Sequence, residues 1–255
     1  MSLRRTQFLV SKGTGRYGLT GEIDVTYEPR MPVANAPVVI FLHGLLGTCD
    51  TYQDVGEQAV HPKLLLMGPL MASYGCRVIG IDGGPRGAPS GPNNPLTHCG
   101  NPSHTARIET VRTSLGVSKL SFVGISMGNY AALQYAVNQP TRIGALVGYS
   151  GLCDLVAFYN ANGNPGYLAD AWSVTAPAAL PAAANITAHA NLVGIPWMDY
   201  QCDDDATVPL ATAQAMAAHI GSSARLTRFA TGGHAGTLQQ GEWEDVVSWI
   251  WDYGS

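Results

Sequence analysis

The chain of 255 residues carries little charge. Asp, Glu, Lys and Arg make up 13% of it, compared with roughly 25% in an ordinary soluble domain. Only three lysines occur, the eleven arginines are dispersed, and the formal net charge is −4. Binding to nucleic acid needs clustered basic side chains, so we expect no nucleic-acid partner. A surface rich in small and amide side chains is expected instead, which is compatible with an apolar pocket mouth or with a contact between copies in a homo-oligomer.

Long apolar runs and a regular cysteine pattern are also lacking. No segment reaches the ~18 consecutive apolar residues of a membrane span. The apolar residues near the N-terminus give way to polar ones at Ser11, so the run is too short for a signal peptide. The cysteines are odd in number and follow no disulfide framework, so we expect them to be mostly reduced and the protein to be cytoplasmic. They are Cys49, Cys76, Cys99, Cys153 and Cys202.

The most informative segment is an apolar strand that runs straight into a serine between two glycines. Residues 120–128 read Leu-Ser-Phe-Val-Gly-Ile-Ser-Met-Gly, and a helix is predicted at 129–138. Strand, G-x-S-x-G and helix together form a nucleophile elbow, a sharp turn that exposes a serine hydroxyl at the top of a sheet. Glycine on either side lets the chain bend without a Cβ clash. Ser126 is therefore the predicted nucleophile.

Three further loops follow apolar strands where such a nucleophile needs partners. They contain His43-Gly44-Leu45, an acidic stretch at 202–209, and a Gly-Gly pair followed by His234. A serine, an acid and a histidine thus occur in that order along the chain. This is the order of one hydrolase architecture, and it differs from the orders used by the chymotrypsin and subtilisin types.

The four motifs resemble those of the α/β-hydrolase superfamily, and the match covers nearly the whole chain. His43-Gly44-Leu45 resembles its H-G-x oxyanion loop, and Gly124 to Gly128 resembles its elbow. Asp205 to Pro209 resembles its D-x-x-V-P acid loop, and Gly232 to His234 resembles its histidine loop. The resemblance implies a doubly wound, mostly parallel eight-stranded sheet with helices on both faces. It also implies that the catalytic groups lie on loops at the carboxyl ends of the strands.

The chemistry assigns a role to each motif. His234 is the expected base that takes the proton of the Ser126 hydroxyl as the oxygen attacks. Negative charge develops on the substrate's carbonyl oxygen and needs preorganised donors, expected to be the backbone N–H groups of Leu45 and Met127. His43-Gly44 is expected to order the loop that carries Leu45. The other histidines show no spacing typical of metal ligands, so we expect neither a metal ion nor a cofactor.

The acid that orients the histidine can be chosen from several aspartates. Asp203, Asp204 and Asp205 are all available in one loop. We prefer Asp205 because it stands three positions before Val208, as the acid does in the family that the chain resembles. Asp154, just after the preceding strand, is the alternative.

The rest of the chain is predicted to complete one domain with an inserted cap. Residues 152–193, rich in alanine and interrupted by prolines, break the strand–helix alternation and are expected to form short helices over the site. Phe158 and Trp172 in this apolar segment are the candidate pocket residues, which favours a small-molecule ester with a hydrophobic group. Strands are expected at 7–12, 22–28, 37–42, 76–82, 120–125, 143–149, 195–201 and 224–229, and further helices at 54–74, 103–115, 210–220 and 242–253.

Asp199 fits its predicted element poorly. It stands inside the apolar strand 195–201, where an isolated charge is costly. We expect it to be partly buried with a partner, and we assign it no chemical role.

The predicted function is a serine hydrolase that cleaves carboxylic esters through an acyl-enzyme intermediate. An acyltransferase, a thioesterase, a peptidase or a cofactor-free lyase would use the same three side chains, so these alternatives stay open. A non-catalytic binding protein on the same scaffold is the alternative from a different class. The low charge content is the only feature that favours it.

Overall fold

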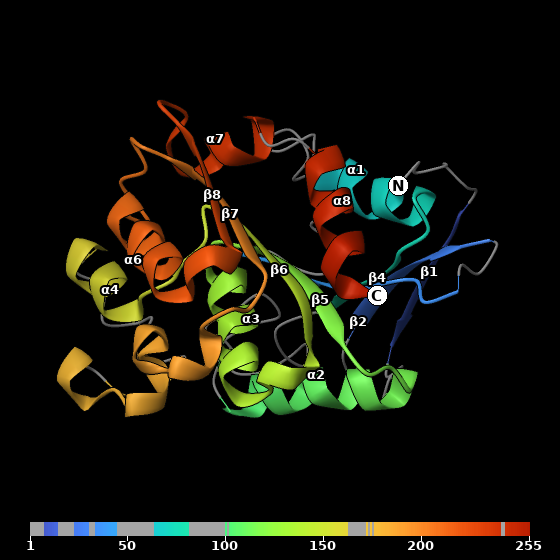
Figure 1. Ribbon diagram of the computed structural model, residues 1–255, viewed down its shortest axis with the longest axis horizontal. Helices are drawn as coiled ribbons and strands as arrows, with labels where there is room; N and C mark the ends of the chain where they lie inside the picture. Colours follow the sequence, from blue (N-terminus) through green and yellow to red (C-terminus); the bar gives the residue numbers. More distant parts are fainter. Residues whose placement is uncertain are drawn as a thin grey trace.

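An eight-stranded sheet runs through the molecule (Figure 1). The computed structural model describes residues 8–14, 23–30, 34–44, 64–81, 100, 102–162, 172, 174, 176–240 and 243–255. The strand order is β1-β2-β4-β3-β5-β6-β7-β8, antiparallel from β1 to β4 and parallel from β4 to β8. The predicted fold class, a mostly parallel eight-stranded sheet, is confirmed. The strands are β1 Phe8–Thr14, β2 Ile23–Pro29, β3 Val38–Leu42, β4 Arg77–Ile81, β5 Leu120–Ile125, β6 Ile143–Tyr149, β7 Trp197–Cys202 and β8 Ala224–Phe229.

Helices cover both faces of this sheet, which explains why its inner strands are apolar throughout. Every residue of β3 and β6 is buried, as expected of parallel strands with a helix layer on each side. One face packs against α2, α3 and α6, and the other against α1 and α8 (Figure 1). The helices are α1 Leu64–Ser73, α2 Pro102–Leu115, α3 Met127–Asn138, α4 Leu155–Asn162, α6 Leu210–Ile220, α7 Gly233–Gln240 and α8 Trp243–Gly254.

The alternation of side chains along β3 assigns its residues to two separate cores. Val38, Ile40 and Leu42 belong to the cluster that includes α3, whereas Val39 and Phe41 belong to the cluster that includes α1 and α8. Successive side chains of a strand point to opposite faces, so each strand contributes to both cores. The central strands are thereby fixed in register, and their carboxyl ends provide a rigid base for the loops described below.

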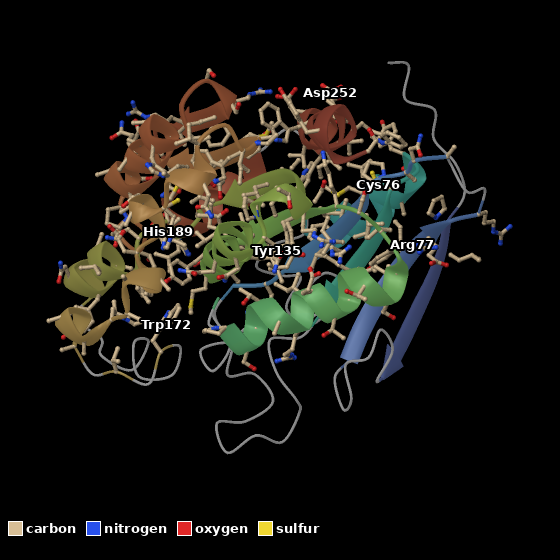
Figure 2. The ribbon with its side chains drawn as sticks, turned by 60° about the horizontal axis from the view of Figure 1, so that its bottom comes forward. Cys76, Arg77, Tyr135, Trp172, His189 and Asp252 are labelled. Atoms are coloured by element: carbon tan, nitrogen blue, oxygen red, sulfur yellow. The ribbon has the colours of Figure 1, made fainter. Side chains whose placement is uncertain are left out.

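The segment between β6 and β7 consists of short helices where the structure describes it. After α4 come four 3-10 helices, η5 Pro177–Ala179, η6 Ala182–Ala184, η7 Ile186–Ala188 and η8 Ala190–Leu192. Side chains of α3 hold the later part in place, since the Tyr130 hydroxyl donates to the carbonyl of Ala184 at 2.7 Å and Gln134 Nε2 to that of Ala183 at 2.8 Å. Trp172 and His189 lie in this part of the molecule (Figure 2). That the segment covers a substrate site stays a prediction.

Among the helices that the structure describes, none is both long and apolar enough to cross a membrane.

Candidate active site

The turn between β5 and α3 holds Ser126 in a backbone conformation that few residues adopt. Its φ of 51° and ψ of −115° lie in a region that costs an L-residue on the order of 1–3 kcal/mol. The flanking glycines are required by close backbone contacts. A Cβ on Gly124 would lie 2.4 Å from the backbone nitrogen of Asn129, and one on Gly128 would lie 2.0 Å from the carbonyl oxygen of Leu42. The G-x-S-x-G pattern therefore lets α3 start directly against the sheet.

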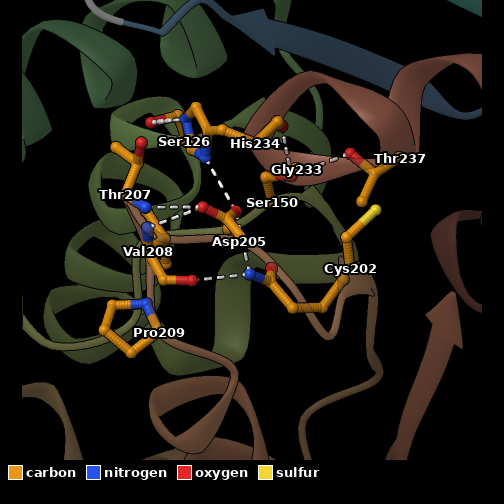
Figure 3. Close-up of polar contacts among 12 residues, drawn as sticks. Ser126, Ser150, Cys202, Asp205, Thr207, Val208, Pro209, Gly233, His234 and Thr237 are labelled. Carbon is orange, nitrogen blue, oxygen red and sulfur yellow. Dashed lines mark hydrogen bonds and ion pairs between the residues drawn. The ribbon is translucent and has the colours of Figure 1, made fainter. Parts of the chain in front are cut away.

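The loops after β5, β7 and β8 bring a serine, an aspartate and a histidine together (Figure 3). Nε2 of His234 lies 3.0 Å from Oγ of Ser126, although the two residues are 108 positions apart in the sequence. Nδ1 of the same ring lies 2.8 Å from Oδ2 of Asp205. A hydroxyl, an imidazole and a carboxylate thus form one hydrogen-bonded line. In such a line the ring can accept the hydroxyl proton while the carboxylate holds the Nδ1–H.

The side chain of Asp205 is fully buried and surrounded by donors. Its Oδ1 accepts the backbone N–H groups of Thr207 at 2.8 Å and Val208 at 2.9 Å, and its Oδ2 accepts Gln201 Nε2 at 3.0 Å. Burial raises the pKa of this carboxyl, but the hydrogen bonds from His234 and from the backbone outweigh it and leave the pKa below its ordinary value. The aspartate is therefore held as the carboxylate that can orient and stabilise the imidazole.

The other aspartates that the sequence offered have different partners. Asp154 accepts two N–H groups at the start of α4, at 2.8 and 3.0 Å. Asp203 pairs with Arg228, and Asp204 accepts backbone N–H groups in the loop after β8. Among these four candidates, Asp205 is the one whose carboxylate contacts the imidazole.

The loop after β3 passes directly beside the elbow. His43 is buried, and its Nδ1 lies 2.8 Å from the carbonyl oxygen of Gly44. A Cβ on Gly44 would lie 3.4 Å from Cβ of Ser126. Met127 begins α3 immediately after Ser126, so its backbone N–H lies next to the serine. Leu45, the other predicted oxyanion donor, lies outside the described residues, and the roles of His43 and Gly44 in ordering its loop stay predictions.

The two candidate pocket residues pack in the same apolar cluster. Phe158 on α4 is 3% exposed and belongs to the core that includes α3. Trp172 is partly buried against that cluster. Whether either side chain also contacts a substrate stays a prediction.

The expectation that Asp199 is partly buried is wrong, because the residue is fully buried. Its Oδ1 lies 2.3 Å from the point where a Cβ on Gly148 would sit, and Asn129 Oδ1 lies 2.9 Å from the same point. The carboxyl thus occupies space that Gly148 leaves open because it has no side chain, close to Asn129 of α3. Burial raises the pKa of Asp199 well above its ordinary value, opposed only in part by the backbone N–H groups of Gly151 and Tyr200.

Two polar residues at this site were missed by the sequence analysis. Gln201 Nε2 donates both to Asp205 and to the carbonyl oxygen of Val208 at 2.7 Å, and so braces the acid loop from inside. Oγ of Ser150 lies 2.6 Å from the carbonyl oxygen of His234. A buried glutamine in an apolar strand just before the acid loop is a detectable signal. Nothing in the sequence around Ser150 distinguishes it from an ordinary turn serine.

No metal centre is evident in the part of the chain that the structure describes. It contains no group of three or more His, Cys, Asp or Glu side chains arranged to hold a metal ion.

The chain matches a known protein family in sequence. The family model described as the alpha/beta hydrolase fold matches residues 37–162. No curated protein matches the chain by sequence.

Solved structures share the fold over almost the full chain. A candidate dienelactone hydrolase from Klebsiella pneumoniae has a TM-score of 0.66 at 14% identity, covering 97% of this chain and 100% of its own. A 2-hydroxy-6-oxo-6-phenylhexa-2,4-dienoate hydrolase from a Rhodococcus species has a TM-score of 0.59 at 16% identity, covering 96% and 99%. Naproxen esterase from Bacillus subtilis has a TM-score of 0.57 at 14% identity, covering 98% and 93%. At these identities the similarity shows a common fold.

Proposed function

Because this chain belongs to the α/β-hydrolase superfamily, we propose that it is a serine hydrolase that cleaves carboxylic esters through an acyl-enzyme intermediate. The observation that carries the proposal is the hydrogen-bonded line from Ser126 through His234 to Asp205. The esterase and hydrolase names of proteins with the same fold support it.

In acylation, Oγ of Ser126 attacks the carbonyl carbon of the ester while Nε2 of His234 takes the hydroxyl proton. The bond to the alcohol oxygen then breaks, and the imidazolium gives its proton to the leaving alcohol. Asp205 keeps Nδ1 protonated and stabilises the imidazolium between the two steps. The backbone N–H groups of Leu45 and Met127 are the proposed donors to the oxyanion, and one such donor typically contributes about 3 kcal/mol.

In deacylation, a water molecule takes the place of the alcohol. His234 accepts a proton from the water as its oxygen attacks the acyl carbon. The bond to Ser126 breaks, the imidazolium returns the proton to the serine oxygen, and a carboxylic acid leaves. The enzyme is then restored, and one ester has been converted into one acid and one alcohol.

The proposed substrate has a hydrophobic acyl or aryl group. The segment between β6 and β7 is apolar in sequence, and its Phe158 and Trp172 pack on the core next to α3, the helix that begins at the nucleophile. Apolar walls with few polar groups are typical of sites for small apolar ligands.

The test is turnover of a series of p-nitrophenyl esters of increasing chain length by the wild type and by Ser126→Ala. We expect hydrolysis by the wild type, with longer acyl chains favoured up to a limit, and loss of at least about a thousandfold in the variant. Adding an alcohol acceptor separates an acyltransferase, which would transfer the acyl group in preference to hydrolysis. Saturable ligand binding by both proteins without turnover by either would contradict the proposal and favour a binding protein.

A further inference from the structure

Polar side chains hold the main chain on which His234 sits. Asp204 accepts the backbone N–H of Gly232 at 3.2 Å and that of Gly233 at 2.8 Å. Ser150 donates its hydroxyl to the carbonyl oxygen of His234 at 2.6 Å (Figure 3). Hydrogen bonds thus hold the histidine loop both just before the histidine and at the histidine itself.

The contact of Asp204 follows from the parallel pairing of β7 with β8. Cys202 lies opposite Phe229 at the ends of these strands, and the N–H of Asp203 donates to the carbonyl of Phe229 at 2.8 Å. The acid loop and the histidine loop therefore leave the sheet side by side. The next residue, Asp204, reaches across to the two glycines before the histidine.

The glycine pair explains why this loop needs hydrogen bonds from other residues to hold it in place. Gly232 and Gly233 have φ values of 141° and 60°, conformations that glycine adopts readily and other residues avoid. Two successive glycines also leave the chain with the greatest conformational freedom. Gly233 is the first residue of α7, and a carboxylate beside the first N–H groups of a helix supplies acceptors that the helix itself lacks.

Ser150 holds its position at a conformational cost. It is buried and has a φ of 48°, which an L-residue keeps only where its surroundings enforce it. Its N–H donates to the carbonyl of Tyr200 at 2.8 Å. Its Oγ also lies 2.9 Å from Oγ1 of Thr237 on α7. Since the single hydroxyl proton of Ser150 goes to the carbonyl of His234, Thr237 is the donor in the second contact.

We propose that Asp204 and Ser150 are positioning residues, which fix the main chain of His234 so that its Nε2 stays within reach of Oγ of Ser126. The inference rests on the proposed function, since it concerns the same imidazole. Proton transfer depends steeply on geometry, and a displacement of about 1 Å can reduce the rate on the order of 100-fold.

The first experiment compares Asp204→Ala with Arg228→Gln. Each substitution removes an exposed interaction of the acid loop: Arg228→Gln removes its ion pair with β8, and Asp204→Ala removes its hydrogen bonds to the histidine loop. Only Asp204→Ala therefore releases the histidine loop. For Asp204→Ala we expect kcat on p-nitrophenyl esters to fall about 10- to 100-fold with KM nearly unchanged. Asp204→Asn should recover part of the loss because its amide oxygen can still accept an N–H. Arg228→Gln should retain the wild-type kcat.

The second experiment uses two substitutions of Ser150 that differ in stability. Ser150→Gly and Ser150→Ala both remove the hydroxyl, but glycine adopts a φ of 48° without strain and alanine does not. A positioning role predicts the same fall in kcat for both variants, with a higher Tm for the glycine variant. If kcat follows Tm instead, so that Ser150→Gly keeps wild-type turnover, the positioning role of Ser150 is wrong.

The rate at which a fluorophosphonate labels Ser126 separates this inference from the proposed function. A wild type that labels but cleaves no ester would remove the ester proposal, and slower labelling of Asp204→Ala and Ser150→Gly would still support the positioning roles. Unchanged turnover and labelling in both variants would overturn those roles while leaving the esterase intact. A wild type that neither cleaves nor labels would overturn both.

Discussion

Ser126 and Ser150 stand opposite each other at the carboxyl ends of neighbouring parallel strands, both with a positive φ, 51° and 48°. The residues that precede them, Ile125 and Tyr149, are paired with each other in the sheet. One hydroxyl contacts the side chain of His234 and the other its carbonyl oxygen. Backbone strain therefore occurs at the two points where the sheet meets the histidine, as is common at functional sites.

The strain at Ser126 predicts a stability difference between two inactive variants. Ser126→Gly should unfold at a higher temperature than Ser126→Ala, because only alanine retains the Cβ that disfavours this backbone conformation. We expect a difference of about 1 kcal/mol, or roughly 2–4 °C in Tm for a chain of this size. Thermal unfolding followed by circular dichroism measures it, and equal Tm values would show that the conformation is not strained.

Asp205 and Asp154 have different contacts, so replacing them should have different effects on turnover and stability. Asp205→Asn should reduce kcat on the order of 10⁴-fold, the effect known for the corresponding change in a serine protease, because an amide next to Nδ1 favours the wrong tautomer. Asp154→Ala removes only the cap of α4, so it should keep its turnover while losing about 1 kcal/mol of stability. Steady-state kinetics and thermal unfolding of both variants decide. A larger loss of kcat in Asp154→Ala would assign the acid to the other loop.

The burial of Asp199 predicts how stability depends on pH. Its pKa is raised in the folded protein, so its contribution is most favourable below the ordinary value near 3.8 and is lost as the pH rises through the folded value. Asp199→Asn keeps the shape of the neutral acid but cannot ionise. The variant should therefore have a higher Tm than the wild type at pH 8, and the difference should shrink towards pH 4. A gap that widens on acidification would mean that the buried group is a stabilised carboxylate.

The close approach of α3 to β3 predicts the cost of a methyl group at Gly128. A Cβ there would overlap the backbone of Leu42, so Gly128→Ala should destabilise the protein by roughly 1–3 kcal/mol or more. Gly116→Ala is the matched control, because Gly116 has a φ of 66° with no atom within 4 Å of the added Cβ. The control should lose only the conformational term, about 1 kcal/mol. Chemical denaturation of both variants tests this order.

The sequence alone allowed the central strands to be predicted well. β5 and β6 lie at the predicted residues 120–125 and 143–149, and β8 and α6 also match their predicted bounds. For β5 and β6 the reason is physical, since strands that are buried on both faces need continuous apolar runs, and turn residues delimit those runs. The motif loops follow the parallel strands β3, β5, β7 and β8, so their spatial proximity could be inferred from the carboxyl ends of a parallel sheet.

Features that depend on long-range packing were not predictable. α7 begins at Gly233, where two glycines favour a loop, yet the helix packs against β7. The start of α2 is different: it begins at Pro102 rather than at the predicted 103, and the local signal was present, since proline is well suited to the first turn of a helix. The full burial of Asp199 depends on the space beside Gly148, a residue on another strand. The hydrogen bond from Ser150 to the histidine loop likewise joins residues 84 positions apart.

The most direct test of the account is the site at which a fluorophosphonate attaches to the wild-type protein and to His234→Ala, read by mass spectrometry of the intact protein and of its peptides. The account predicts one adduct per wild-type chain, located on Ser126, and labelling slowed at least about a hundredfold without the imidazole. An adduct on another residue, or equal labelling rates in the two proteins, would contradict a nucleophilic Ser126 activated by His234.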